Sequence, residues 1–162
     1  LLGSDKDRRE HAPVVAAIKQ RLAPLCSDIE APATPQIRVL PHLLHLHTPI
    51  RATTRSPSVQ VLELVRALHP TPAVGGTPTP AAVALIAEIE QLDRGRYAGP
   101  VGWIGASGDG EWGIGLRSAQ VEAHGSQVRL FAGCGIVADS VPADELAESN
   151  AKLIPVRDAL TP

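Results

Sequence analysis

The chain has 162 residues, of which 44% are apolar and 20% are charged, values that are ordinary for a soluble globular domain with one compact core. The formal net charge is −2, and the 15 Lys and Arg residues are scattered along the sequence instead of forming a stripe. This charge pattern excludes nucleic acid as a partner, because binding to phosphate backbones needs a concentrated basic surface.

Membrane and secretion signals are absent from the sequence. No apolar run approaches the roughly 20 residues that span a bilayer, and the start lacks the basic, apolar and small-residue blocks of a signal peptide. We therefore expect no membrane partner and a cytoplasmic protein. Cys26 and Cys134 lie far apart and match no zinc-ligand spacing, so we expect two free thiols.

The first predicted element is a helix between Lys6 and Leu25, where apolar residues recur at helical spacing opposite a basic face. It should end before Pro24. Pro13 lacks an N–H and restricts the residue before it, so either the main helix begins near Ala12 or its first turn is kinked.

The next part of the chain predicts extended segments and then two short helices. Residues 27–41 contain three prolines and read as a surface connection with one short strand near its end, and residues 43–54 read as a strand. Ser56-Pro57 and Thr79-Pro80 each resemble an N-cap followed by proline in the first helical turn. The helices that they open should flank a Pro/Gly loop over residues 69–80.

Beyond Gly95 the pattern changes to short strands separated by two turn sequences, Gly108-Asp109-Gly110 and His124-Gly125-Ser126. This pattern predicts an antiparallel meander. A last helix should run from about Val141 to Ala159, with acidic residues in its first turn. The fold class is therefore α+β. The strands of the meander are expected at residues 101–107, 113–123 and 127–131.

Two blocks carry a resemblance to a known family. Residues 69–76 read His-Pro-Thr-Pro-Ala-Val-Gly-Gly, and residues 94–103 read Arg-Gly-Arg-Tyr-Ala-Gly-Pro-Val-Gly-Trp. Together they resemble the signature of isochorismate synthases, which belong to the chorismate-binding enzymes. Gly76-Thr77-Pro78-Thr79 lacks the lysine that anthranilate and aminodeoxychorismate synthases usually have there. The resemblance runs from Leu2 to Lys152 and implies the chorismate-binding enzyme fold, with an antiparallel sheet and helices packed on its outer side.

Two acidic blocks are candidates for a metal site. Read alone, Lys6-Asp7-Arg8-Arg9-Glu10-His11 is a solvated helix start, and Glu145, Glu148 and Lys152 share one helix face as an ordinary surface pair would. By resemblance to the family, Glu10 and Glu148 are Mg²⁺ ligands and Asp7 and Glu145 support them. Mg²⁺ suits this role because it binds through a few carboxylates and keeps water or substrate oxygens.

The expected substrate-binding residues follow from the same resemblance. Arg117 sits in a predicted strand with buried neighbours, where its planar fork would need a carboxylate partner; a structural salt bridge is the alternative. The resemblance implies that Arg117 and Tyr97 hold the enolpyruvyl carboxylate, helped by backbone N–H groups. The remaining substrate-binding residues implied by the resemblance are Gly133 and Gly135 at those N–H groups, His45 near the ring, Ala73 in the pocket wall and Lys152 facing the substrate.

The resemblance implies that the parent protein is an isomerase converting chorismate to isochorismate, a precursor in siderophore or menaquinone biosynthesis. A salicylate synthase is the nearest alternative, and a non-catalytic lobe is another. The general acid and base of the family precede the Lys6 block, so we expect no catalytic residue in this chain. Because the chain opens on Leu1 and contains no Met, residues 1–162 are expected to be the C-terminal part of a chorismate-binding domain. Its partners would be chorismate, isochorismate, the N-terminal part of the same enzyme and, through self-association, a second copy.

Overall fold

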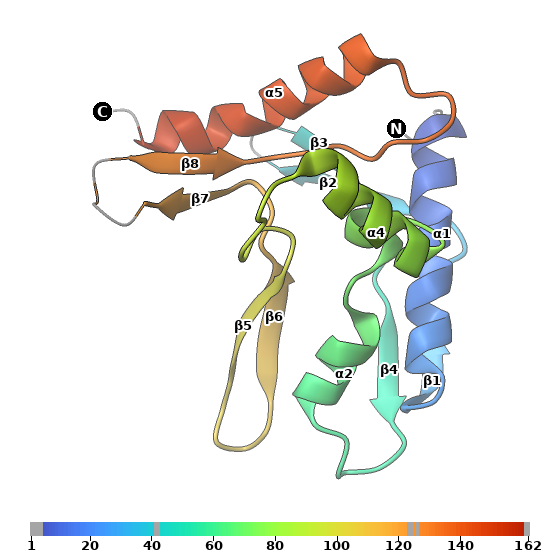
Figure 1. Cartoon of the computed structure of the whole chain (residues 1–162). Coiled ribbons are helices and arrows are strands. Elements are labelled where there is room, and N and C mark those ends of the chain that lie inside the picture. The colour runs from blue at the N-terminus through green and yellow to red at the C-terminus, as the bar shows by residue number, and fades with distance from the viewer. Residues whose placement is uncertain (1–4, 41–42, 123–124, 126, 161–162) are drawn as a thin grey trace. The chain divides into compact units, whose positions relative to one another are not determined.

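The computed structural model describes residues 5–40, 43–122, 125 and 127–160, with the side chains of residues 5–8, 40 and 43 left out (Figure 1). Its contacts divide the chain into two compact units. The first unit comprises Leu1–Leu92 and Gly102–Trp112, and the second comprises Asp93–Val101 and Gly113–Pro162. Each unit is described by itself below.

The first unit begins with helix α1, Asp5–Leu22. The helix ends before Pro24, as predicted, but it continues through Pro13. The expectation that it begins near Ala12 is therefore wrong. The φ angle of proline is compatible with a helix, so at this position the loss of one N–H is tolerated. The acidic block that contains Glu10 consequently lies in the first turns of one uninterrupted helix.

Four strands of the first unit form two separate antiparallel pairs. Strand β1, Cys26–Glu30, pairs with β4, Arg51–Thr54, and β2, Gln36–Leu40, pairs with β3, Leu43–His47. The strand predicted over residues 43–54 is divided at Thr48-Pro49-Ile50, where proline cannot donate to a ladder. Strand β1 is an addition to the prediction, because residues 27–41 were expected to hold one strand only.

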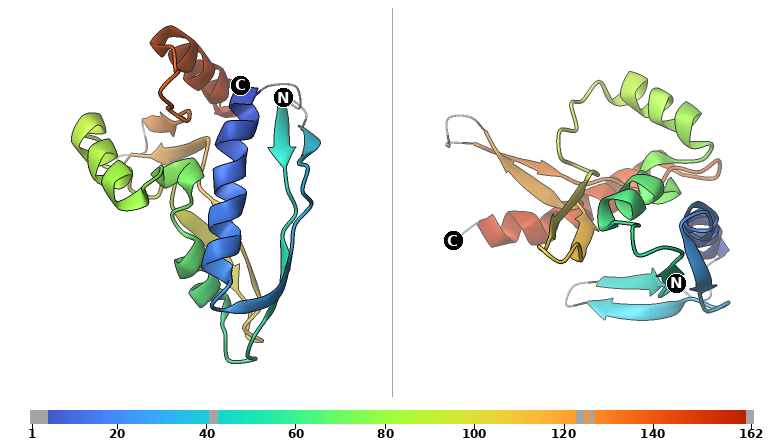
Figure 2. Two further views of the ribbon diagram at one scale, coloured as in Figure 1. Left: turned by 90° about the vertical axis from the view of Figure 1, so that its right-hand side faces the viewer. Right: turned by 90° about the horizontal axis from the view of Figure 1, so that it is seen from below.

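Helices α2, Val61–Leu68, and α4, Thr79–Glu90, occupy the two predicted helical segments, and the short helix α3, Pro72–Gly75, lies between them. The predicted N-caps are wrong. The N-cap of α2 is Gln60, because Ser56 instead accepts the Val59 N–H in a preceding turn, at 3.1 Å. The N-cap of α4 is Pro78, one residue before Thr79. In both views of Figure 2, α1 lies beside α2 and α3.

In the second unit, β7, Ser118–Val121, pairs antiparallel with β8, Val128–Phe131, and helix α5, Pro142–Leu160, contacts β8. The hairpin of β5, Pro100–Ile104, and β6, Gly110–Ile114, crosses the division between the units and turns at Gly108, whose φ is +87°. The helix predicted from Val141 to Ala159 is confirmed.

The predicted meander is only partly correct. Its two hairpins are present, but among the described residues β6 and β7 do not pair with each other. After β6 the Gly115 N–H donates to the Gly99 carbonyl at 2.9 Å, and Arg117 adopts a φ of +48°, so the chain leaves the direction of the strand. The α+β class is confirmed, and the described residues form four two-stranded sheets in place of one continuous sheet.

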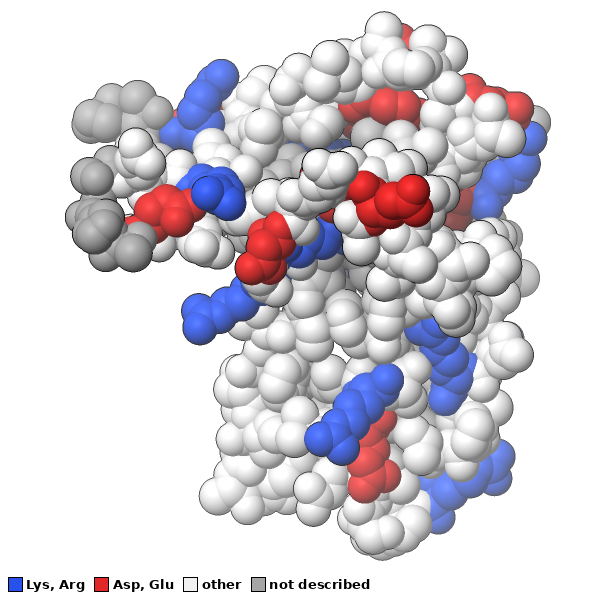
Figure 3. Space-filling view, viewed as in Figure 1, with Lys and Arg blue, Asp and Glu red and all other residues white. Residues whose placement is uncertain are grey.

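Buried apolar side chains are few in the part of the chain that the structure describes: Leu22, Cys26, Ala98 and Phe131. Many large apolar side chains are exposed, among them Val39, whose relative exposure is 74%. Basic and acidic side chains are interspersed on the face shown in Figure 3, consistent with the scatter of charges in the sequence. Of the described helices, none combines the length and apolar character needed to cross a bilayer.

Candidate functional site

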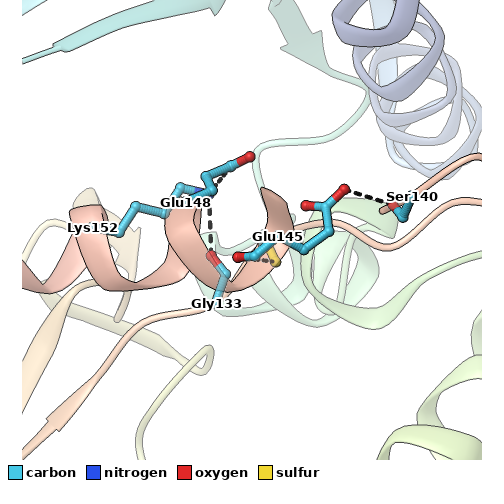
Figure 4. Close-up of polar contacts among 6 residues, drawn as sticks. Gly133, Ser140, Glu145, Glu148 and Lys152 are labelled. Atoms are coloured by element: carbon cyan, nitrogen blue, oxygen red, sulfur yellow. Dashed lines mark hydrogen bonds and ion pairs between the residues drawn. The ribbon is translucent and has the colours of Figure 1, made fainter. Parts of the chain in front are cut away.

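Glu145 lies in the first turn of α5 and is buried, with 5% of its surface exposed. Ser140 precedes the helix, and its Oγ donates a hydrogen bond to Glu145 Oε1 at 2.7 Å (Figure 4). The same Oγ accepts the Val137 N–H at 3.1 Å. A carboxylate placed here also benefits from the helix dipole. Ser140 therefore fixes Glu145 to the segment between β8 and α5.

The Cys134 thiol lies on the other side of Glu145 and donates to its backbone carbonyl at 3.4 Å. Burial raises the pKa of this thiol, and the hydrogen bond to Glu145 raises it further. Cys134 is therefore held as the neutral thiol. With no disulfide, Cys26 and Cys134 are both free thiols, as predicted.

Glu148 and Lys152 form an ion pair one helical turn apart, with Lys152 Nζ 2.6 Å from Glu148 Oε1. Lys152 Nζ also donates to the Gly133 carbonyl at 3.1 Å, so the lysine joins α5 to the segment that follows β8 (Figure 4). The Glu148 side chain is 48% exposed and that of Lys152 25% exposed. Because solvent screens such a pair, its contribution to stability is small. Its geometry places an ammonium group beside Gly133.

Tyr97 packs against this same segment. Its ring stacks on Phe131 with centroids 5.2 Å apart, and the Arg94 guanidinium lies 5.5 Å from its ring centroid. A Cβ added at Gly133 would lie 2.8 Å from the Tyr97 hydroxyl oxygen, closer than carbon and oxygen normally approach. Any side chain at residue 133 would therefore force the Tyr97 hydroxyl or the backbone of residue 133 to move. The structure brings together the predicted residues Tyr97, Gly133 and Lys152.

Arg117 does not occupy the environment predicted for it. It lies between β6 and β7 with φ +48°, and the side chain of its neighbour Leu116 is 49% exposed. The expectation of a strand with buried neighbours is wrong, because the left-handed conformation at Arg117 ends the extended backbone. Arg117 itself is half-buried, and Gly135 is exposed beyond β8.

The remaining candidates belong to the first unit. Glu10 lies on α1 and its Oε1 atom is buried, His45 lies at the middle of β3 opposite Arg38, and Ala73 is exposed on α3. The prediction for Asp7 falls on a side chain outside those described. A hydrogen bond of 2.7 Å between His11 Nε2 and Thr48 Oγ1 ties α1 to the chain just after β3. Glu10 and Glu148 thus belong to different units.

The donor types suit a hard divalent cation, because carboxylate oxygens are the ligands that Mg²⁺ prefers. Within the described ranges there is no cluster of three or more His, Cys, Asp or Glu side chains able to hold a metal. Mg²⁺ needs fewer protein ligands than such a cluster would supply, since this ion keeps several water or substrate oxygens. Glu148 has the more accessible carboxylate, and Glu145 is placed to support it from the preceding turn.

Four residues of this region were missed by the sequence-based prediction: Phe131, Arg94, Ser140 and Cys134. Ser140 had a usable signal, because it belongs to the Asp-Ser-x-Pro sequence before α5, and a Ser before a helix start is a common source of hydrogen bonds to that turn. Phe131 is the single Phe of the chain, but nothing in the sequence pairs it with Tyr97. Their contact depends on how β8 lies beside the segment before β5.

Known proteins that resemble this chain identify its family. The sequence model of a family described as chorismate binding enzyme matches residues 1–161. The chain belongs to the chorismate-binding enzyme family. Chorismate-binding relatives include the isochorismate synthase DhbC of Bacillus subtilis, which is 47% identical over 94% of this chain, and the salicylate biosynthesis isochorismate synthase of Pseudomonas aeruginosa, 46% identical over 99%. The chain spans 38% and 33% of the lengths of these two relatives.

A solved structure of a relative supports the same family assignment. The crystal structure of DhbC from Bacillus anthracis matches 99% of this chain with a TM-score of 0.94 and 43% sequence identity, and the matched region is 42% of that chain. The fold of this chain is therefore that of the corresponding part of a chorismate-binding enzyme.

Proposed function

We propose that the protein to which this chain belongs is a Mg²⁺-dependent isochorismate synthase, an isomerase that converts chorismate to isochorismate. The observation that carries the proposal is 46–47% identity to relatives named as isochorismate synthases, over 94–99% of the chain. The product would serve siderophore or menaquinone biosynthesis. We place the reaction in the cytoplasm, where free thiols such as Cys26 and Cys134 are the normal state.

In this proposal the second unit binds the enolpyruvyl carboxylate of chorismate. Tyr97, held in place by Phe131, donates a hydrogen bond from its hydroxyl, and Arg117 supplies a charged fork. Backbone N–H groups near Gly133 and Gly135 complete the set of donors. Support for this assignment comes from the close approach between Gly133 and Tyr97, which puts the Gly133 backbone beside the Tyr97 hydroxyl.

The proposed metal ligands are Glu10 and Glu148, with Asp7 and Glu145 in support. A bound Mg²⁺ would supply positive charge for the substrate carboxylate and reduce repulsion among these acids. Glu148 now pairs with Lys152, so a cation at Glu148 competes with the lysine ammonium. Lys152, which by the family resemblance faces the substrate, would then be available to place its charge there.

In the first unit, His45 on β3 is proposed to donate a hydrogen bond near the departing hydroxyl, and Ala73 on α3 to form part of the pocket wall. The acid and base that protonate the leaving oxygen and activate water are proposed to come from another part of the enzyme. Exposed apolar side chains such as Val39 and Ile136 are proposed to be covered by that same part, since the relatives are more than twice as long as this chain. Residues 1–162 expressed alone would then self-associate or aggregate.

The full-length protein, incubated with chorismate and Mg²⁺ and separated by liquid chromatography, tests the proposal. Isochorismate is the expected product, and a chelator should abolish both turnover and chorismate binding. Glu10→Gln and Glu148→Gln should each raise the Mg²⁺ concentration needed for half-maximal rate, while Glu111→Gln on exposed β6 serves as the control. Salicylate as the product would indicate a salicylate synthase, and chorismate binding without turnover would indicate a non-catalytic lobe.

A further inference from the structure

Arg21 contacts both ends of the segment Leu68–Thr79, which connects α2 to α4. Arg21 is half-buried in the last turn of α1. Its Nη1 donates to the Leu68 carbonyl at 2.9 Å and to the Pro70 carbonyl, and its Nη2 donates to Thr79 Oγ1 at 3.2 Å. One guanidinium therefore satisfies two backbone carbonyls and one side chain, all within the first unit.

The segment has little space in which to adjust. Thr79 Oγ1 donates in turn to the Gly76 carbonyl at 3.1 Å. Gly75 is buried, and a Cβ added there would lie 3.0 Å from the Pro70 ring and 3.3 Å from the Thr79 methyl group. Gly76 has a φ of +68°, a conformation that favours glycine. The inner side of the segment is thus packed closely around the atoms that Arg21 holds.

Ala73 lies on the exposed side of this segment, between the two ends that Arg21 contacts. The two carbonyls need donors, and arginine presents several N–H groups in a rigid plane, whereas lysine presents a single flexible ammonium. The position of α3, and of Ala73 with it, therefore depends on a side chain from α1. Burial, and then the charge of Arg21, also lower the pKa of His69, which favours the neutral imidazole beside this segment.

We propose that Arg21 is a positioning residue of the enzyme: it sets the place of Ala73 in the wall of the chorismate pocket by holding Leu68, Pro70 and Thr79. The proposal rests on the proposed function, because the pocket wall is defined by chorismate. It assigns Arg21 no contact with the substrate. Its effect is on substrate binding through α3.

The test compares Arg21→Met and Arg21→Lys with Lys19→Met, which removes an exposed charge from the same helix turn, all in the full-length protein. For both Arg21 variants we expect the KM for chorismate to rise about tenfold with kcat changed by less than about threefold. Amide exchange of Gly75 and Gly76, whose N–H groups bond Thr71 and Pro72, should become about tenfold faster. Lys19→Met should change neither quantity. Thr79→Val removes one of the Arg21 contacts together with the hydrogen bond from Thr79 to the Gly76 carbonyl. It should shift both quantities in the same direction and serves if Arg21→Met does not fold.

Three results would overturn the proposal. Unchanged exchange at Gly75 and Gly76 would show that Arg21 does not hold the segment. Faster exchange with an unchanged KM would reduce Arg21 to a purely structural role. Wild-type behaviour of Arg21→Lys would show that charge, and not the planar fork, is what matters. Failure of the proposed function gives a different result. The wild-type protein would then make no isochorismate, whereas amide exchange at Gly75 and Gly76 would still show whether Arg21 holds the segment Leu68–Thr79.

Discussion

Gly133→Ala introduces a methyl group where the Tyr97 hydroxyl approaches the backbone closely. The new Cβ would lie 2.8 Å from the Tyr97 hydroxyl oxygen. Optimal non-bonded contacts of a carbon atom begin at about 3.5 Å, so one of the two groups must move by about 0.5 Å or more. Tyr97 cannot easily retreat, because its ring stacks on Phe131, which is only 6% exposed. Overpacking of this kind lowers the free energy of unfolding by about 1–3 kcal/mol.

The functional effect should be larger than the effect on stability. Displacement of a substrate-positioning group by about 1 Å can reduce rates about a hundredfold, so we expect kcat/KM for chorismate to fall between about tenfold and a hundredfold. Steady-state kinetics and urea denaturation of the full-length variant measure the two effects. Gly113→Ala is the matched control, because a Cβ there meets no atom within 4 Å.

Tyr97→Phe separates the two causes. In the Gly133→Ala background, loss of the hydroxyl should remove the clash and restore stability without restoring activity. The reasoning is refuted if Gly133→Ala alone keeps both its stability and its kcat/KM within the range of Gly113→Ala, because the close approach would then have no consequence.

Two further predictions concern Ser140 and His69. Ser140→Ala removes a donor from buried Glu145 and should lower the free energy of unfolding by about 1–3 kcal/mol in urea denaturation. Ser149→Ala on the same helix is the control, and a loss below about 0.5 kcal/mol would contradict the role given to Ser140. Burial, and then Arg21, lower the pKa of His69 from its ordinary value of 6.5, so the unfolded chain binds a proton more readily than the folded chain. Stability should therefore be full above about pH 6.5 and decrease as the pH falls through that value toward the folded pKa. His69→Gln should make this decrease shallower in pH-dependent denaturation, and an identical decrease in the variant would show that His69 does not contribute to it.

Periodic patterns allowed the helices to be predicted well. α1, α2 and α4 appear where apolar residues recur at helical spacing, and α5 appears where acidic residues were expected in a first helical turn. The N-caps were predicted less well. Ser56 and Thr79 have side chains suited to an N-cap. However, the Ser56 carbonyl accepts the Val59 N–H in a turn before α2, and the Thr79 hydroxyl donates to the Gly76 carbonyl. A two-residue sequence signal does not encode these turns.

The site residues also differ in how well the sequence predicted them. Tyr97, Gly133 and Lys152 come from three segments distant in sequence, and only the family resemblance suggested that they meet. The supporting contacts of Phe131, Ser140 and Arg21 depend on packing between elements, for which the sequence carries no local pattern. Arg117 was misplaced because an apolar sequence around it resembled a strand, whereas its positive φ interrupts one.

In the proposed conversion to isochorismate, chorismate gains a hydroxyl group from water at C2 while its C4 hydroxyl departs. The direct measurement is mass spectrometry of the product that full-length protein forms from chorismate and Mg²⁺ in water enriched in ¹⁸O. The account predicts isochorismate that carries one ¹⁸O atom and is two mass units heavier. Unlabelled product, or chorismate that stays unchanged although the protein binds it, would contradict the account.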